Sequence, residues 1–172
     1  MGKTKQFVTH TNAEDRFAGL ITYGDRTKAL PDGAVISITL GEQLSVWKTV
    51  VNAAVSQFVI KQMKKSEGLL YAELKGHLKE GYGFTMTVWE RKAMKPFRDQ
   101  GAHKFAMRFF SWVFYGKNSQ AYFLTYKANG TIPTTEEAYK LLKTHGKFYD
   151  GGKLIRPASM PVLAEKDQNK TV

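Results

Sequence analysis

The chain has 172 residues, close to the usual size of one domain, with 26 Lys and Arg against 15 Asp and Glu and a net charge of +11. Its 42% hydrophobic residues can fill a core, and the absence of cysteine excludes disulfides, thiolate metal sites and a thiol nucleophile. No apolar run has the length that a membrane span needs. The composition predicts a basic, cytoplasmic protein. The charge favours anionic partners such as nucleic acid, a membrane surface or acidic small molecules, but Lys and Arg are scattered along the chain, and a basic surface that is only solvated stays the alternative.

The two ends of the sequence are polar, and the middle is not. We expect residues 1–16 to form a polar N-terminal arm and residues 151–172 a polar C-terminal tail. Residues 17–150 are then a single α+β domain.

Hydrophobic spacing in this domain predicts strands and helices in chain order. Residues 34–40 form a short segment rich in β-branched side chains, which is typical of a strand. From Leu44 to Gly68 the spacing is helical, and its apolar stripe consists of Trp47, Val50, Val51, Ala54 and Phe58. Two strands follow, over residues 69–78 and 82–89, joined by a short hairpin turn. A second helix is expected from about Pro96 to Phe114, then a strand over residues 120–128 and a short helix to about Thr144.

The order strand, helix, strand, strand, helix, strand predicts the βαββαβ topology of ferredoxin-like domains, with an antiparallel sheet. On the third expected strand, from Phe84 to Trp89, large side chains would point to both faces of the sheet. Helices on one side would leave the other face of this sheet open. We therefore expect two chains to stack their sheets in a homodimer, as an α+β barrel.

The second helix carries the residues best suited to chemistry. If it is regular after Pro96, then Asp99, His103, Met107 and Phe110 lie on one face. A carboxylate one turn from an imidazole can fix its tautomer and raise its pKa. Two interpretations stay open: a histidine in an aromatic pocket, as a haem-iron ligand or an acid–base group, or a histidine that is only hydrogen-bonded in a core or an interface.

Trp89, Phe97 and the segment Gly101-Ala-His103-x-x-Ala-Met107 resemble the second half of the dimeric α+β barrel superfamily, which includes the cofactor-free antibiotic-biosynthesis monooxygenases. The Phe…Gly-x-His-x-x-Ala spacing is most similar to the spheroidene (carotenoid) monooxygenases, which are haem proteins. The resemblance implies an obligate dimer with a pocket between helices and sheet in each protomer. It also implies that His103 is the ligand of the haem iron.

From these observations we expect a monooxygenase-like protein that binds an apolar or aromatic small molecule. His103 and Asp99 are the expected catalytic residues, and His103, Met107 and Phe110 would hold haem. The expected substrate pocket is lined by Trp89, Phe97, Trp47, Phe58 and Tyr71. Without haem, an electron-rich phenol could reduce oxygen itself, with His103 as the base.

Two other functions stay open. One is a non-catalytic ligand-binding or interaction protein of the same fold. The other is RNA binding, because Gly81-Tyr-Gly-Phe84 resembles the RNP1 sequence of RNA-recognition motifs and would place Tyr82 and Phe84 to stack on bases. Glu80 stands where that motif has Lys or Arg, and the first strand has no aromatic partner, so nucleic acid is the least favoured partner.

Overall fold

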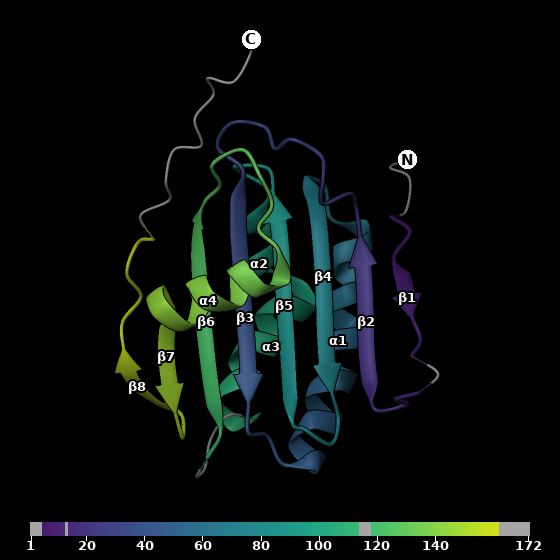
Figure 1. Cartoon of the computed structure of the whole chain (residues 1–172), viewed down its shortest axis with the longest axis vertical. Coiled ribbons are helices and arrows are strands. Elements are labelled where there is room, and N and C mark those ends of the chain that lie inside the picture. The colour runs from purple at the N-terminus through teal and green to yellow at the C-terminus, as the bar shows by residue number, and fades with distance from the viewer. Residues whose placement is uncertain (1–4, 13, 114–117, 162–172) are drawn as a thin grey trace.

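The chain is an α+β protein built around one antiparallel sheet (Figure 1). The computed structural model describes residues 5–12, 14–113 and 118–161, with the backbone alone for residues 110–113. Its eight strands are β1 (Val8–His10), β2 (Ala18–Tyr23), β3 (Val35–Glu42), β4 (Leu69–His77), β5 (Tyr82–Trp89), β6 (Gln120–Lys127), β7 (Lys147–Asp150) and β8 (Lys153–Arg156). Its four helices are α1 (Val46–Lys65), α2 (Met94–Asp99), α3 (Gly101–Val113) and α4 (Thr135–His145).

The strands lie in the order β1-β2-β4-β5-β3-β6-β7-β8, and every neighbouring pair is antiparallel. The four strands predicted from the sequence are the central β4, β5, β3 and β6. Residues 8–10 and 153–156, from the segments expected to be arm and tail, form the two edge strands. Polar segments can take these places because strand pairing satisfies backbone groups whatever the side chains are.

Helices cover both faces of the sheet (Figure 1): α1, α2 and α3 lie on one face, and α4 crosses the other. Thr134 and Glu137 form a capping box that starts α4. Ala138 and Leu142, one turn apart, are both fully buried in the core with the strands beneath. The expectation that this sheet face would be open is therefore wrong, because the apolar side of α4 packs on it. Dimerisation through the sheet stays a prediction.

The larger core cluster fills the space between α4 and the sheet. Its strand residues come from β3, β5, β6 and β4 and include Ile36, Ile38, Phe84, Met86, Val88, Leu124 and Tyr71. A smaller cluster lies between the helices and the other sheet face. It contains Ile60, Met63, Leu69, Ala72, Trp89 and Phe97.

The expected apolar stripe of α1 does not face the sheet. Trp47, Val50, Ala54 and Phe58 are exposed, whereas Thr49 near the start of the helix is buried. The helix is confirmed by the structure, and the sheet surface beneath its first half is not apolar.

That sheet surface is a row of glycines across neighbouring strands. Gly76, Gly83 and Gly41 pair in register from β4 through β5 to β3. A Cβ on Gly83 would lie 3.3 Å from Nδ2 of Asn52, so α1 passes close over Gly83 and turns a polar side chain to it. Trp47 and Phe58 are exposed on the side of α1 that faces away from the sheet. No helix in the described part of the chain is long and apolar enough to cross a membrane.

Candidate functional site

The expected second helix is broken in two at Gln100. Gln100 is extended and Gly101 has a φ of +58°, a left-handed conformation that glycine adopts readily. The side chain of Gln62 on α1 holds the break: its Nε2 donates to the carbonyls of Phe97 and Gln100, at 3.0 and 3.1 Å. Its Oε1 accepts the backbone N–H of His103 at 2.8 Å. One side chain of α1 thus positions the start of α3.

His103 sits in a half-buried place beside the smaller core cluster. Its ring lies 4.7 Å from that of Phe97, which stacks at 4.5 Å on the fully buried Trp89. Nδ1 of His103 is 3.2 Å from the carbonyl of Arg98. A carbonyl can only accept, so Nδ1 carries the proton and Nε2 keeps its lone pair in the neutral ring. Burial lowers the pKa of His103, which favours this neutral form.

Asp99 does not orient His103. It is exposed and pairs with the neighbouring Arg98, whose Nε is 2.8 Å from Oδ1. The hydrogen bond and charge of Arg98 lower the pKa of Asp99. The expected tautomer contact is wrong because it assumed one continuous helix, and the break at Gln100 turns Asp99 away. The backbone carbonyl of Arg98 takes its place.

The rest of the expected pocket is dispersed. Trp89 and Phe97 lie together near His103, but Trp47 and Phe58 are exposed on α1. Tyr71 belongs to the core cluster on the opposite face of the sheet. The side chain of Phe110 lies outside the described residues.

Of the residues expected to hold haem, His103 and Met107 are the two whose side chains the structure describes, and they do not form a slot for that group. A porphyrin needs a flat apolar slot beside its iron ligand. Phe97 instead packs on the imidazole, and Gln62 holds the backbone of His103. Met107, one turn along α3, is exposed and closes no such slot.

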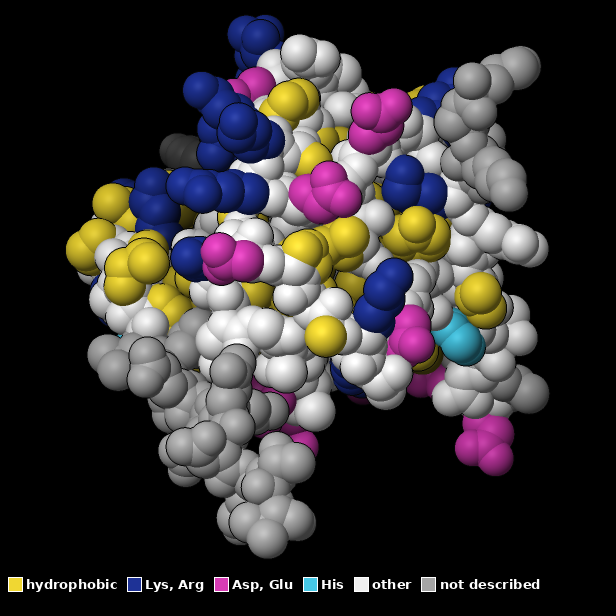
Figure 2. All heavy atoms as spheres, turned by 90° about the horizontal axis from the view of Figure 1, so that it is seen from above, with side chains coloured by type: hydrophobic (Ala, Val, Ile, Leu, Met, Phe, Trp, Pro, Cys, Tyr) yellow, Lys and Arg dark blue, Asp and Glu magenta, His cyan; other side chains and the backbone are white. Residues whose placement is uncertain are grey.

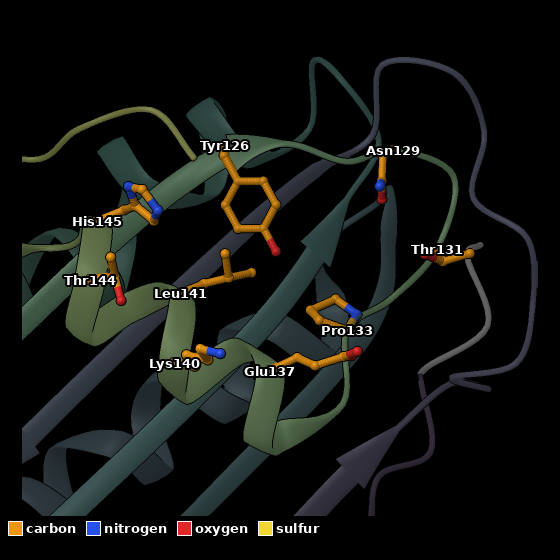
Figure 3. Close-up of a pocket in the computed structure, with 9 residues that line it drawn as sticks. All are labelled: Tyr126, Asn129, Thr131, Pro133, Glu137, Lys140, Leu141, Thr144 and His145. Atoms are coloured by element: carbon orange, nitrogen blue, oxygen red, sulfur yellow. The ribbon is translucent and has the colours of Figure 1, made fainter. Parts of the chain in front are cut away.

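Two clefts flank α4 on the opposite sheet face. The Tyr126 cleft, shown in Figure 3, has a volume of about 370 Å³ and is lined by Tyr126, Asn129, Thr131, Pro133, Glu137, Lys140, Leu141, Thr144 and His145. The phenol of Tyr126 points between Leu141 and Pro133 (Figure 3). Burial, with the charge of Glu137, raises the pKa of Tyr126 to about 12, so this phenol is neutral at physiological pH.

The second, the Tyr139 cleft, has a volume of about 460 Å³ and is lined by Leu40, Glu42, Gln43, Lys75, Glu80, Tyr82, Phe84, Thr135 and Tyr139. The hydroxyl of Tyr139 donates to Oε1 of Glu42 at 2.6 Å, and Lys143 pairs with the other carboxylate oxygen. Gln43 has a φ of +56°, which a residue with a side chain rarely adopts. Phe84 is buried here, so it cannot stack on RNA bases as the RNP1 resemblance implied.

A buried polar network adjoins the Tyr139 cleft at Thr135. The carboxylate of Glu73, 4% exposed, pairs with Arg26 and accepts hydrogen bonds of 2.7 Å from the hydroxyls of Tyr71 and Thr135. Burial, with the hydrogen bond and charge of Glu73, raises the pKa of Tyr71 to about 12. The phenol therefore stays a donor to the carboxylate at physiological pH.

Sequence reasoning missed both clefts and this network. Glu73 and Tyr71 are two residues apart on β4 and so share a face, which is the one available signal. Arg26 and Thr135 come from distant segments, and nothing in the sequence links them to Glu73.

The described residues contain no group of three or more His, Asp and Glu side chains placed to hold a metal ion. Comparison with known proteins finds no matching family model, no matching curated protein and no matching solved structure.

Proposed function

We propose that the chain is a small-molecule-binding protein of ferredoxin-like topology, and that its ligand is an aromatic molecule with a polar group. The topology is supported by the central strand order β4-β5-β3-β6, with α1 connecting β3 to β4 and α2 and α3 connecting β5 to β6. The ligand is placed in the Tyr139 cleft.

The single observation that carries this proposal is the make-up of the Tyr139 cleft. Leu40 and Phe84 form an apolar floor, and Tyr82 and Tyr139 add aromatic walls. Charged groups converge on the rim, among them Lys75. Apolar and aromatic surface with a few fixed polar groups is typical of ligand sites, and the volume suits a small aromatic molecule.

The polar groups at the rim of the Tyr139 cleft have defined protonation states and partners. Burial and the hydrogen bond to Glu42 raise the pKa of Tyr139, so its hydroxyl remains a donor to that carboxylate. Lys143 neutralises the same carboxylate and lies 3.9 Å from the ring centre of Tyr122. Glu42 is thereby compensated, and the exposed ammonium of Lys75 is left to meet an anionic group of the ligand.

The test is titration with naphthoate, an aromatic carboxylate, followed by amide chemical shifts in NMR. We expect shifts at residues 41–43 and 135–139. Lys75→Trp, which removes the cation and fills the cleft, should weaken binding at least tenfold. Thr144→Trp in the Tyr126 cleft is the matched control and should leave binding unchanged. Shifts confined to residues 126–133, or equal affinity in both variants, would show that the Tyr139 cleft is not the site.

A second function, the monooxygenase expected from the sequence, is favoured by the tautomer of His103. Its free Nε2 could take the proton of a phenol, and the phenolate could then reduce oxygen without a cofactor. Trp89 Nε1, buried with no hydrogen-bond partner among the described residues, is a further donor in the same cluster. The non-catalytic alternative needs neither group.

This second function predicts a particular pH dependence. Because burial lowers the pKa of His103, the neutral base should persist below the ordinary histidine pKa of about 6.5, and oxygen uptake with methoxyphenol should fall only at more acid pH. His103→Asn keeps a donor for the Arg98 carbonyl but removes the base, and should lower uptake at least a hundredfold. His145→Asn is the control. Equal uptake in the wild type and His103→Asn would reject His103 as the base.

The homodimer implied by the family resemblance is part of this proposal. Because α4 occupies the centre of the sheet face, the partner would contact α4 and the strands beside it.

A further inference from the structure

Among the described residues, the outward side of the helix layer carries several exposed apolar side chains. On α1, Trp47 is 64% and Phe58 67% exposed, and on α3, Phe105 is 61% exposed. We use the name helix surface for these residues and their exposed neighbours, which are Val46, Val50 and Met107. α1 and α3 pack side by side, so the set belongs to one face of the protein.

This exposure follows from how the helix is built. Trp47, Val50, Ala54 and Phe58 recur at helical spacing along one side of α1, and the opposite side, with the buried Thr49 and with Asn52 over Gly83, faces the sheet. The ring of Phe105 stacks on that of Phe109 at 6.0 Å, which holds it in place. A continuous apolar stripe on the outside of a domain indicates an interaction surface.

Positive charge gathers at one end of this surface. The stripe of α1 continues into the exposed Lys61 and Lys65, and Lys104 is exposed near the start of α3. α2 and the residues before it add the exposed side chains of Arg91, Lys92 and Lys95. Figure 2 looks down on this end of the molecule and shows Lys and Arg side chains gathered on the left, the side of β6, β7 and β8 in Figure 1, with others scattered on the right, where α1 lies.

Few carboxylates offset these cations. The exposed acids of the same segments are Glu67, Glu90 and Asp99, and Asp99 is already paired with Arg98. The apolar stripe therefore has a basic end with an excess of positive charge.

We propose that the helix surface docks on the anionic surface of a lipid bilayer. Its apolar side chains enter the boundary between headgroups and acyl chains, and the lysines and Arg91 lie among the headgroups. Trp47 has the amphipathic ring that is enriched at this boundary. The proposal is independent of the ligand site, which lies on the opposite face of the sheet.

Charge decides between a bilayer and a second copy of the chain. A second copy on the helix surface would bring the basic ends of two such surfaces close to one interface, with Lys61, Lys65 and Arg91 exposed in each. An anionic bilayer attracts the same charge, and each lysine near it strengthens binding by about fivefold.

The test is co-sedimentation of the full chain with vesicles of phosphatidylcholine alone and of phosphatidylcholine mixed with phosphatidylglycerol. We expect binding to the mixed vesicles that weakens as salt is added, with a blue shift of tryptophan emission. The variant Trp47→Ser/Phe58→Ser/Phe105→Ser should bind at least tenfold more weakly. Lys61→Glu/Lys65→Glu/Lys92→Glu should lose the preference for anionic lipid.

The matched control is Leu154→Ser/Ile155→Ser, which removes two exposed apolar side chains from the edge strand β8. It should bind vesicles as the wild type does. Equal loss in this control and the triple serine variant, or no binding to mixed vesicles, would overturn the proposal. So would light scattering that shows a dimer for the wild type and a monomer for the triple serine variant, because a second copy would then cover the surface.

Discussion

Replacing Glu73 by alanine is expected to lower the free energy of unfolding by about 3 kcal/mol, because it leaves the partly buried guanidinium of Arg26 without its carboxylate. Two further hydroxyls, on Tyr71 and Thr135, lose their acceptor at the same time. Tyr71→Phe removes one hydrogen bond to the carboxylate and keeps the ion pair. Its cost should be smaller, about 1.5 kcal/mol. Urea unfolding of the two variants beside the wild type measures both values.

The control for this prediction is a surface pair. Asp32 lies 3.5 Å from Lys127, and both side chains are well exposed. Asp32→Ala should change the unfolding free energy little, since exposed ion pairs contribute little. If Glu73→Ala proved as mild as Asp32→Ala, the buried network would not stabilise the fold in the way described.

Leu142→Ala is expected to cost about 3 kcal/mol as well, by a different mechanism. Leu142 is fully buried between α4 and the sheet, and its truncation removes apolar contact and leaves a cavity. Because α4 also carries Thr135 and Tyr139, its looser packing should widen the Tyr139 cleft and weaken naphthoate binding. Urea unfolding measures the loss of stability. Amide hydrogen exchange along residues 135–145 measures how far the packing of α4 loosens.

Leu154→Ala is the matched control, because Leu154 is half exposed on the edge strand β8. Its effect should stay within about 0.5 kcal/mol. Rapid exchange confined to α4 in Leu142→Ala would show that this helix can detach while the sheet remains folded. Unchanged exchange and unchanged stability would contradict the packing of α4 described above.

Local pattern was sufficient for the central elements. The predicted strand at residues 34–40 is β3 (Val35–Glu42), and the predicted helix between Leu44 and Gly68 contains α1 (Val46–Lys65). The short helix after Pro133 is α4, which begins with the capping box of Thr134 and Glu137. These features depend on neighbours a few positions apart, so the periodicity of the chain reports them directly.

The break of the second helix could not be predicted from local spacing in the sequence. Gly101 permits the turn, but Gln62, some forty positions earlier, makes the hydrogen bonds that stabilise it. The same break separates Asp99 from His103 and moves the role of orienting the imidazole to the Arg98 carbonyl. A side chain distant in sequence thus stabilises the break that separates Asp99 from His103, the expected catalytic pair.

By itself the sequence determined the α+β class, the central strands and helices, and the basic charge, because each depends on composition or short-range spacing. Only the tertiary structure decided which surfaces meet: α4 on the sheet, the stripe of α1 outward, and Glu73 beside Arg26 and Thr135. A stripe of apolar side chains in the sequence indicates that a helix has one apolar side and one polar side. Which side is buried depends on the surface offered by distant strands, and here the side with Thr49 and Asn52 faces the sheet and the apolar side lies outward.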